Sequence, residues 1–240
     1  MSTNIVDKRA AERVPERTLS EQLFRRLSDA IVSGALAPGS KLSEPSLAQQ
    51  YGVSRGPLRE AINRLQERHL VTRTAHFGAR VAELSVRTLE ETFIVREALE
   101  GMAARQAARN CTAEDLAALH RAYARHVRVA KDGGEGPVWR SDDEDFHVLI
   151  VRASGNPMLL RLLTEDFYQL VRFYRSQLIH VRGRGTRTVA EHRRILEAIE
   201  DRDEELAELH MRRHIAAARE ALSAALRRQN DNQEQTGISL

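Results

Sequence analysis

Four side chains in the second half of the chain have the ligand chemistry of a divalent metal site. Asp143 and His147 are four residues apart, a spacing that places both on one face of a helix. His192 and His214 follow further along the chain. Three neutral imidazoles and one carboxylate suit zinc, nickel or another first-row divalent ion. The chain holds nine histidines, so an accidental pair is the more common explanation of the Asp143–His147 spacing taken alone.

A second group with recognisable chemistry lies in the first third of the chain. Arg55 and Arg59 are also four residues apart, and they share a helix face that points away from Leu58 and Ile62. Arginine can bind guanine O6 and N7 in a bidentate manner, or it can pair with phosphate. Ser54 at the expected helix start can bind a phosphate together with the first backbone N–H groups. Solvent-facing arginines on an ordinary helix are the alternative explanation of either residue alone.

The net charge of +3 conceals an uneven distribution. Residues 1–84 hold 13 basic and 9 acidic side chains, whereas residues 85–240 hold 24 and 25. Lys41 precedes the helix of Arg55, and His76 lies in a later turn that ends with Gly78. A basic first third on a near-neutral remainder indicates that this third meets a polyanion.

Helical periodicity and turn residues define the elements that position these side chains. In the first third they predict a helix over 19–33, a short helix capped by Ser43, a helix from Ser54 to His69, and extended segments at 70–73 and 79–81. A winged helix-turn-helix has this order of elements: three short helices followed by a two-stranded hairpin. Its last helix enters the major groove of DNA. After Leu84 the pattern predicts six long helices, over 85–109, 112–131, 137–153, 157–181, 187–200 and 203–229. The expected fold is therefore mostly α, an N-terminal winged helix-turn-helix followed by an all-helical bundle.

Length and composition exclude several classes of protein. The chain has 240 residues and an apolar fraction of 42%, which is enough for one large domain or two small ones with a buried core. No apolar run approaches the roughly 18 residues that a membrane span needs. The polar start and the single cysteine argue against secretion and against a disulfide framework, so we expect a cytoplasmic protein with no membrane partner.

The turn and the helix after it resemble the DNA-binding domain of the GntR family of bacterial transcriptional regulators. The likeness rests on LAQQYGVSRGPLREAI at 47–62 and on IVSGALAPG at 31–39, and it extends over residues 19–83. It implies that Ser54, Arg55, Arg59 and the wing around His76 and Gly78 touch DNA. The chain departs from the family at three positions. It has Gly56 where Thr is frequent, His69 where Gly is frequent, and Pro45 where some relatives have a base-reading Arg.

Residues 85–229 resemble the helical effector domain of the FadR subfamily, in its shorter, VanR-like group. Metal-binding members have Asp-x-x-x-His on one helix and two further histidines on the last two helices. The resemblance therefore implies a zinc or nickel site at Asp143, His147, His192 and His214. An arginine of the first helix faces the cavity in such domains, which implies that Arg96 contacts an effector. Arg172 on the fourth long helix is a weaker candidate, and an internal ion pair of Arg96 with Glu97 or Glu100 is the alternative.

The resulting hypothesis is a homodimeric regulator, most often a repressor in this family, on a palindromic operator. A small organic acid would bind beside the metal, because a cation and an arginine attract a carboxylate. We expect a flexible tail at 1–17, the DNA-binding domain at 18–83, the effector and dimerisation domain at 84–229, and a second tail at 230–240. A purely structural metal is one alternative. A metal-dependent hydrolase is another, but the chain shows no well-placed general base or nucleophile beside the four ligands.

Overall fold

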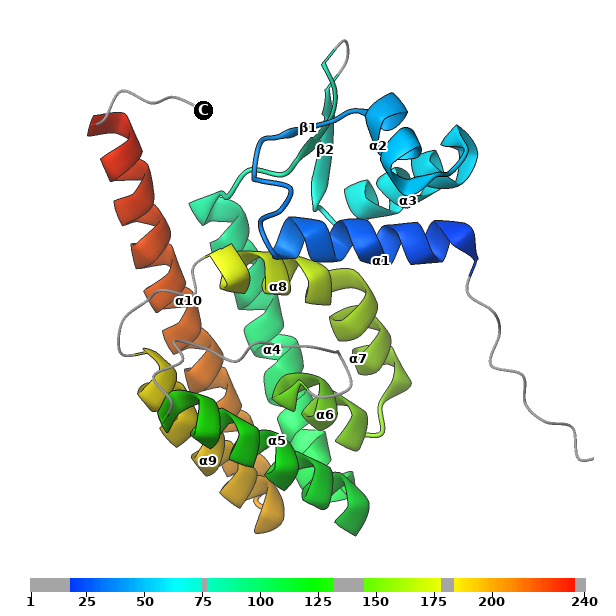
Figure 1. The fold of residues 1–240 in the computed structure, drawn as a ribbon. Helices are drawn as coiled ribbons and strands as arrows, with labels where there is room; N and C mark the ends of the chain where they lie inside the picture. The colour runs from blue at the N-terminus through cyan, green and yellow to red at the C-terminus, as the bar shows by residue number, and fades with distance from the viewer. Residues whose placement is uncertain (1–17, 75–76, 132–144, 178–183, 236–240) are drawn as a thin grey trace, which may run out of the picture.

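Two groups of elements follow one another along the chain and lie one above the other (Figure 1). The computed structural model describes residues 18–74, 77–131, 145–177 and 184–235. The upper group is the winged helix-turn-helix, and the lower group is entirely helical in its described residues. The predicted fold class is therefore confirmed. No helix among the described residues is long and apolar enough to cross a membrane.

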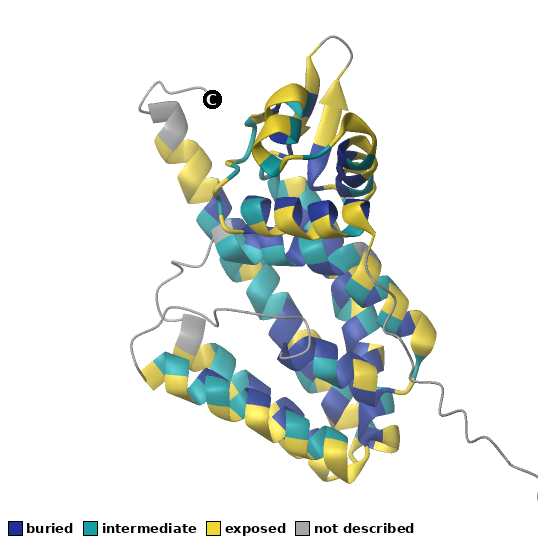
Figure 2. Ribbon diagram, turned by 45° about the vertical axis from the view of Figure 1, so that its right-hand side comes forward, coloured by how far each residue is buried: buried dark blue, intermediate teal, exposed yellow. Residues whose placement is uncertain are grey.

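The winged domain consists of three helices and a small antiparallel sheet. Its elements are α1 (Leu19–Val32), β1 (Lys41–Leu42), α2 (Glu44–Tyr51), α3 (Arg55–Glu67), β2 (Val71–Thr74) and β3 (Gly78–Val81). The apolar stripes predicted from helical spacing face one core, because Leu23, Leu27, Leu58 and Ile62 are at most 1% exposed. In Figure 2 the facing sides of α1 and α3 are buried, whereas the strands are exposed toward the tip of the wing.

The wing has one strand more than the sequence predicted. The strand order is β1-β3-β2, and Lys41 of β1 pairs with Arg80 of β3. A strand of two residues is too short to leave a periodic signal, which is why only the hairpin of β2 and β3 was expected. The third strand ties the segment before α2 to the wing and so fixes the position of Lys41.

Two left-handed residues shape the turns around α3. Gly52 has φ 63° and ends α2, as the turn requires. His69 has φ 58° just after α3, and the Leu70 N–H donates to the Leu65 carbonyl at 2.9 Å. This bond closes a Schellman motif, in which glycine is the usual residue at the left-handed position. His69 therefore occupies a backbone position that favours glycine.

The helical domain is built around the long pair α4 and α10. Its elements are α4 (Val86–Asn110), α5 (Ala113–Lys131), α6 (Phe146–Ala153), α7 (Pro157–Arg161), the π-helix η2 (Leu162–Phe167), α8 (Tyr168–Gln177), α9 (Arg184–Glu200) and α10 (Glu204–Gln235). α4 and α10 pack against each other over much of their length. Gly101 allows the close approach, because a Cβ there would lie 2.6 Å from Cγ of Arg212.

The helix boundaries differ most from the sequence prediction in three places. The described part of the helix expected at 137–153 is α6, which starts at Phe146, with Asp145 as its N-cap in extended backbone. The helix expected at 157–181 is divided by η2, and its described part ends at Gln177. α10 continues to Gln235, so residues 230–235 are helical where a frayed tail was expected. Polar side chains do not stop an exposed helix, so periodicity alone placed its end too early.

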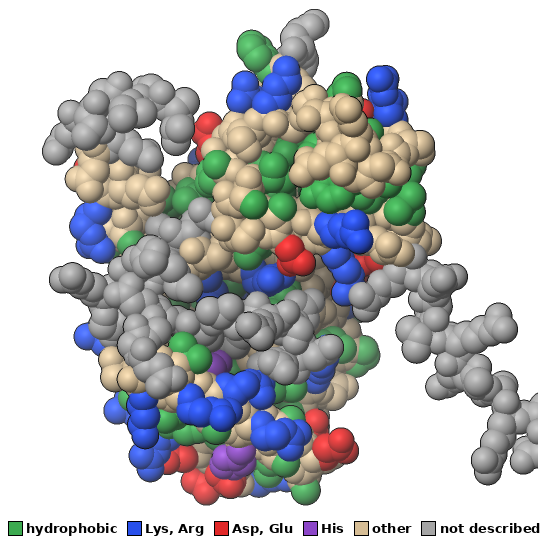
Figure 3. All heavy atoms as spheres, viewed as in Figure 1, with side chains coloured by type: hydrophobic (Ala, Val, Ile, Leu, Met, Phe, Trp, Pro, Cys, Tyr) green, Lys and Arg blue, Asp and Glu red, His purple; other side chains and the backbone are tan. Residues whose placement is uncertain are grey.

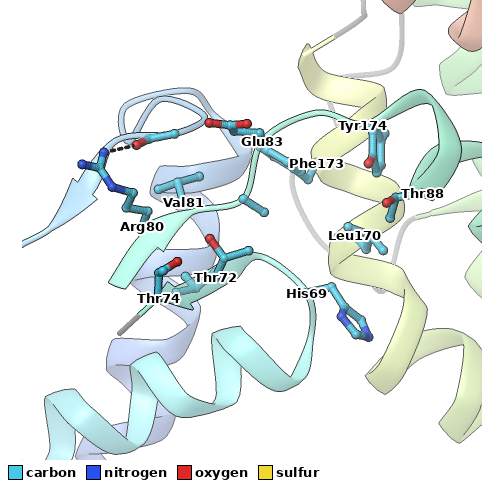
Figure 4. A pocket seen from close by; sticks show the side chains of 13 residues that line it. His69, Thr72, Thr74, Arg80, Val81, Glu83, Thr88, Leu170, Phe173 and Tyr174 are labelled. Carbon is cyan, nitrogen blue, oxygen red and sulfur yellow. Dashed lines mark hydrogen bonds between the residues drawn. The ribbon is translucent and has the colours of Figure 1, made fainter. Parts of the chain in front are cut away.

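The junction between the two domains is formed mainly by α8. α1 lies against α8 (Figure 1), and the Tyr174 hydroxyl of α8 donates to the Ser85 carbonyl at 3.1 Å, just before α4. A cleft of about 440 Å³ remains beside this contact. Figure 4 shows β2 and β3 of the wing on one side of the cleft and α8 with the start of α4 on the other.

Candidate nucleic-acid interface and candidate metal centre

The start of α3 presents polar groups that its own helix does not use. Ser54 is the N-cap residue, but its side chain makes no capping hydrogen bond. Arg55 follows as the first helical residue, and both side chains are exposed. The first N–H groups of the helix also lack intrahelical partners, which makes this end a favourable place for a phosphate.

A carboxylate that the sequence analysis did not single out lies next to these arginines. Glu44 accepts from Nε of Arg59 at 2.7 Å, and its other oxygen is 3.5 Å from Nη2 of Arg73. Arg73 also donates to Asn63 at 3.1 Å. Arg59 nevertheless remains 61% exposed, so the pair is open to solvent. Glu44 therefore orients two basic side chains and competes with any phosphate that approaches them.

Two of the remaining predicted DNA contacts lie in the small sheet of the wing. Lys41 in β1 and Gly78 in β3 are exposed, and Gly78 has φ 78° at the hairpin turn. His76 lies outside the described residues. Figure 3 shows Lys and Arg side chains projecting at the wing end of the upper domain, and both basic and acidic side chains on the lower domain. Gly56 adjoins open space, so the glycine there is not required by packing.

Three of the four predicted metal ligands converge in the middle of the helical domain. His147 comes from α6, His192 from α9 and His214 from α10, and each is at most 5% exposed. One ring nitrogen of each lies within 4.8 Å of the others. These residues are distant in sequence, so the packing of three helices brings them together.

The orientation of the three rings fits a metal ion. Nε2 of His192 and Nε2 of His214 are 3.3 Å apart. Two nitrogens held at about 2.0–2.1 Å from a tetrahedral zinc ion would lie about 3.4 Å apart. Nδ1 of His214 is engaged by Glu191 at 2.7 Å, and Nδ1 of His147 by Glu100 at 2.6 Å. The Nε2 atoms of these histidines are therefore the candidate ligand atoms, and the two glutamates are outer partners of the kind that metal-binding histidines have.

Burial and neighbouring charges shift the pKa of two groups in the cluster, His192 and Glu100. Burial, with the neighbouring His214 and His147, lowers the pKa of His192 well below its ordinary value. Burial raises the pKa of Glu100, but Arg96 and His147 outweigh it and hold that pKa below its ordinary value. These shifts favour a neutral imidazole at His192 and an ionised carboxylate at Glu100, and neutral imidazole is the form of histidine that binds a metal.

The fourth predicted ligand, Asp143, lies outside the described residues. The helical-spacing argument for it is wrong, because Asp145 between Asp143 and His147 has extended backbone angles. Asp145 itself is buried, accepts from the backbone N–H of His147 at 2.8 Å and lies 3.9 Å from Nη1 of Arg175. Its oxygens therefore serve the start of α6 and an ion pair.

A small hollow adjoins the histidine cluster. It measures about 20 Å³, enough for about one water molecule. Its lining comes from α4, α6, η2 and α8 and includes Arg96, Glu100, His147, Arg172 and Arg175. Its three guanidinium groups outnumber its two carboxylates, Glu100 and Asp145, and this excess of positive charge suits an anion. Side chains of η2 and α8 would have to move to admit an organic acid.

The two predicted effector arginines differ in their partners. Arg96 is buried and pairs with Glu100 one turn later on α4, which is the internal ion pair that the sequence analysis held as the alternative. Arg172 lines the hollow but directs Nη1 to Asp29 of α1 at 3.3 Å. Arg172 therefore lies between the hollow and the DNA-binding domain, which sequence spacing gave no means to detect.

Taken together, the fold and the basic start of α3 define a class: DNA-binding proteins that join a winged helix-turn-helix to an all-helical second domain. A profile of the gntR family of bacterial regulatory proteins matches residues 19–81, and a profile of the FCD domain matches residues 91–217. The chain belongs to the GntR family and is a bacterial transcriptional regulator with a C-terminal FCD domain.

Known proteins agree with this assignment over nearly the whole chain. The "Probable D-xylose utilization operon transcriptional repressor" of Paenarthrobacter nicotinovorans is 31% identical over 86% of this chain and 90% of its own. The regulator BphR of Paraburkholderia xenovorans is 32% identical over 84% of each chain. The solved structure of McbR/YncC from E. coli has the same fold, with a TM-score of 0.68 at 23% identity over 86% of this chain and 98% of that one.

Proposed function

We propose that this regulator is a ligand-responsive repressor whose helical domain binds a divalent metal ion and, beside it, a small carboxylate. The observation that carries the proposal is the convergence of His147, His192 and His214 next to a hollow lined by three arginines. The repressor assignment is supported by relatives that are named repressors. The same histidines would hold a purely structural metal, so the response to a ligand is the property to test.

Zinc or nickel would be held by Nε2 of the three histidines and by the carboxylate of Asp143, the fourth ligand that the family likeness implies. When bound, the ion supplies a positive charge and a Lewis acid toward an anionic ligand. Glu100 and Glu191 orient His147 and His214 through their Nδ1 atoms. Tyr168, Arg172 and Arg175 of α8 close the other side of the hollow.

A carboxylate in the hollow would compete for groups that are already paired. Arg172 pairs with an exposed partner, Asp29, whose side chain is 65% exposed. Arg96 pairs with buried Glu100, and that exchange would leave a buried carboxylate without its partner. The cost of exchange is therefore lowest at Arg172, which makes this residue the preferred carboxylate contact.

The same exchange provides a route to the DNA-binding domain. Asp29 lies on α1, and α1 also holds the recognition helix through Glu21, which pairs with Arg64 of α3 at 2.5 Å. A ligand that takes Arg172 from Asp29 would release one contact between α8 and α1. A coupling of about 1–3 kcal/mol is typical of such two-site regulation.

The protein would act as a homodimer on a palindromic operator. Exposed apolar side chains on the two longest helices support a second copy as the partner: Ile94, Val95, Met102, Leu206 and Leu209. These helices, α4 and α10, pack against each other as the central pair of the bundle.

The proposed function is tested with purified protein and a DNA site selected from a random library. Native mass spectrometry is expected to show a dimer with one divalent ion per chain. Operator affinity, measured against a panel of mono-, di- and tricarboxylates, is expected to change by about 5–150-fold with at least one of them. Asp29→Asn is expected to reduce that response, whereas Asp201→Asn on the far side of the bundle leaves it unchanged. An ion that binds while no carboxylate alters DNA affinity would support the structural-metal alternative instead.

A further inference from the structure

The three histidines of the cluster do not have equivalent outer partners. Nδ1 of His147 and Nδ1 of His214 each contact a carboxylate, Glu100 and Glu191. Nδ1 of His192 instead contacts Nδ1 of His126 on α5, at 2.9 Å. His126 is only 6% exposed, and its sequence surroundings held no sign of a partner.

Coordination of a metal ion by Nε2 of His192 would fix which nitrogen carries the proton in the contact between His126 and His192. Two ring nitrogens at 2.9 Å form a hydrogen bond only if one of them donates. A neutral His192 that binds a metal through Nε2 must carry its proton on Nδ1. His192 is then the donor, and Nδ1 of His126 is the acceptor.

We propose that His126 is the hydrogen-bond acceptor that holds His192 in its Nε2-coordinating tautomer and thereby raises the affinity of the site for its metal ion. The inference rests on the proposed metal centre and names a positioning residue for it. His126 is not itself counted among the ligands, because its Nδ1 is directed at the nitrogen of His192 on the side away from His214.

Packing around His192 supports an orienting role for His126. The ring of Phe146 stacks on His192 with centroids 4.4 Å apart and an interplanar angle of 19°. The stack limits tilting of the His192 ring, but it does not distinguish the two tautomers, because a ring face makes no directional bond to either nitrogen. The bond to His126 supplies this distinction. Unlike the two carboxylates, His126 does so without adding negative charge to the cluster.

The test compares zinc affinity in two variants of the full-length protein by competition with a chromogenic chelator. His126→Phe keeps the ring but removes the acceptor, and we expect at least about tenfold weaker zinc binding. His126→Asn keeps an acceptor oxygen close to the Nδ1 position, so its affinity is expected within about threefold of the unaltered protein. His120→Gln is the matched control, because His120 is an exposed histidine of the same helix that contacts Glu200.

A spectroscopic readout separates positioning from a general loss of structure. Ring nitrogen shifts in 15N-histidine NMR of the chelator-treated protein are expected to report an Nδ1–H tautomer for His192, and a gain of the Nε2–H tautomer in His126→Phe. Equal zinc affinity of His126→Phe and the unaltered protein would overturn the inference, and so would equal losses in the Phe and Asn variants. An unaltered protein that binds no zinc or nickel would instead overturn the metal centre itself, and this inference with it.

Discussion

The two domains place the same kinds of charged side chain in opposite surroundings. In the winged domain, Arg59 and Glu44 form a pair whose arginine is 61% exposed. In the helical domain, Arg96 and Glu100 form a pair whose side chains are 4% and 6% exposed. Exposed pairs contribute about 0–1 kcal/mol, whereas removal of one partner from a buried pair costs about 3–5 kcal/mol. The exposed arginine can therefore exchange its partner for DNA at little cost, while the buried pair maintains one arrangement.

The largest expected effect is on stability, and it follows from breaking the buried pair of Arg96 and Glu100. Glu100→Gln leaves the Arg96 guanidinium without its counter-charge and replaces the carboxylate that contacts His147 with a neutral amide. We expect a loss of about 3–5 kcal/mol in the free energy of unfolding of the metal-free protein. Urea denaturation, monitored by circular dichroism, measures this free energy. A loss below about 1 kcal/mol would mean that the buried pair behaves like a surface pair.

The next effect concerns the exposed arginine at the start of α3. Arg55→Ala is expected to weaken binding to the selected operator by about 1–3 kcal/mol, because a base contact is lost while the fold is untouched. Fluorescence anisotropy at fixed salt measures it. Arg193→Ala is the control, since Arg193 is an exposed arginine of α9 that pairs with Glu197. Unchanged operator affinity would remove Arg55 from the DNA interface.

Glu44→Gln removes the carboxylate of the exposed ion pair, as Glu100→Gln removes that of the buried pair. We expect less than about 1 kcal/mol change in the free energy of unfolding, because the pair with Arg59 is solvated. Operator binding is expected to tighten a few-fold, because Arg59 and Arg73 no longer have a competing carboxylate. The same denaturation and anisotropy experiments apply. Weaker operator binding would show that Glu44 orients Arg59 for DNA more than it competes with it.

The smallest expected effect concerns the backbone after α3. His69→Gly relieves a left-handed conformation that costs about 1–2 kcal/mol in a non-glycine residue, while glycine adds about 0.5–1 kcal/mol of chain entropy to the unfolded state. A net stabilisation of about 0.5 kcal/mol is expected by urea denaturation. His69→Ala, which keeps the strain, is the control and is expected to show no gain.

Local patterns were sufficient for most elements of the winged domain. The spacing of Leu58 and Ile62 located α3 and its buried face, and Gly52 marked the turn before it. Such features depend on interactions within a few residues, so they can be recognised from the sequence of a single segment. The strand of Lys41 was missed because its two residues are extended only through pairing with β3.

The helical domain was less predictable where its contacts join distant segments. Residue types and family likeness indicated His147, His192 and His214, but spacing could not indicate Glu100, Glu191 or His126 as their partners. A glutamate or histidine on a helix has no local feature that distinguishes an outer partner of a ligand from a solvated side chain. Arg172 and Asp29 are 143 residues apart, and only the packing of α8 against α1 brings them together.

The sequence by itself determined the class of this protein, because turn residues, helical periodicity and a basic helix start depend on neighbouring residues only. They can therefore be recognised without knowledge of the tertiary structure. It also supplied the histidines that suit a metal ion. The tertiary structure alone decided which nitrogen of each histidine faces the others, which arginine is committed to a buried carboxylate and which one bridges the two domains. Those properties depend on burial and on hydrogen bonds between segments far apart in the chain, and neither exists until the helices have packed.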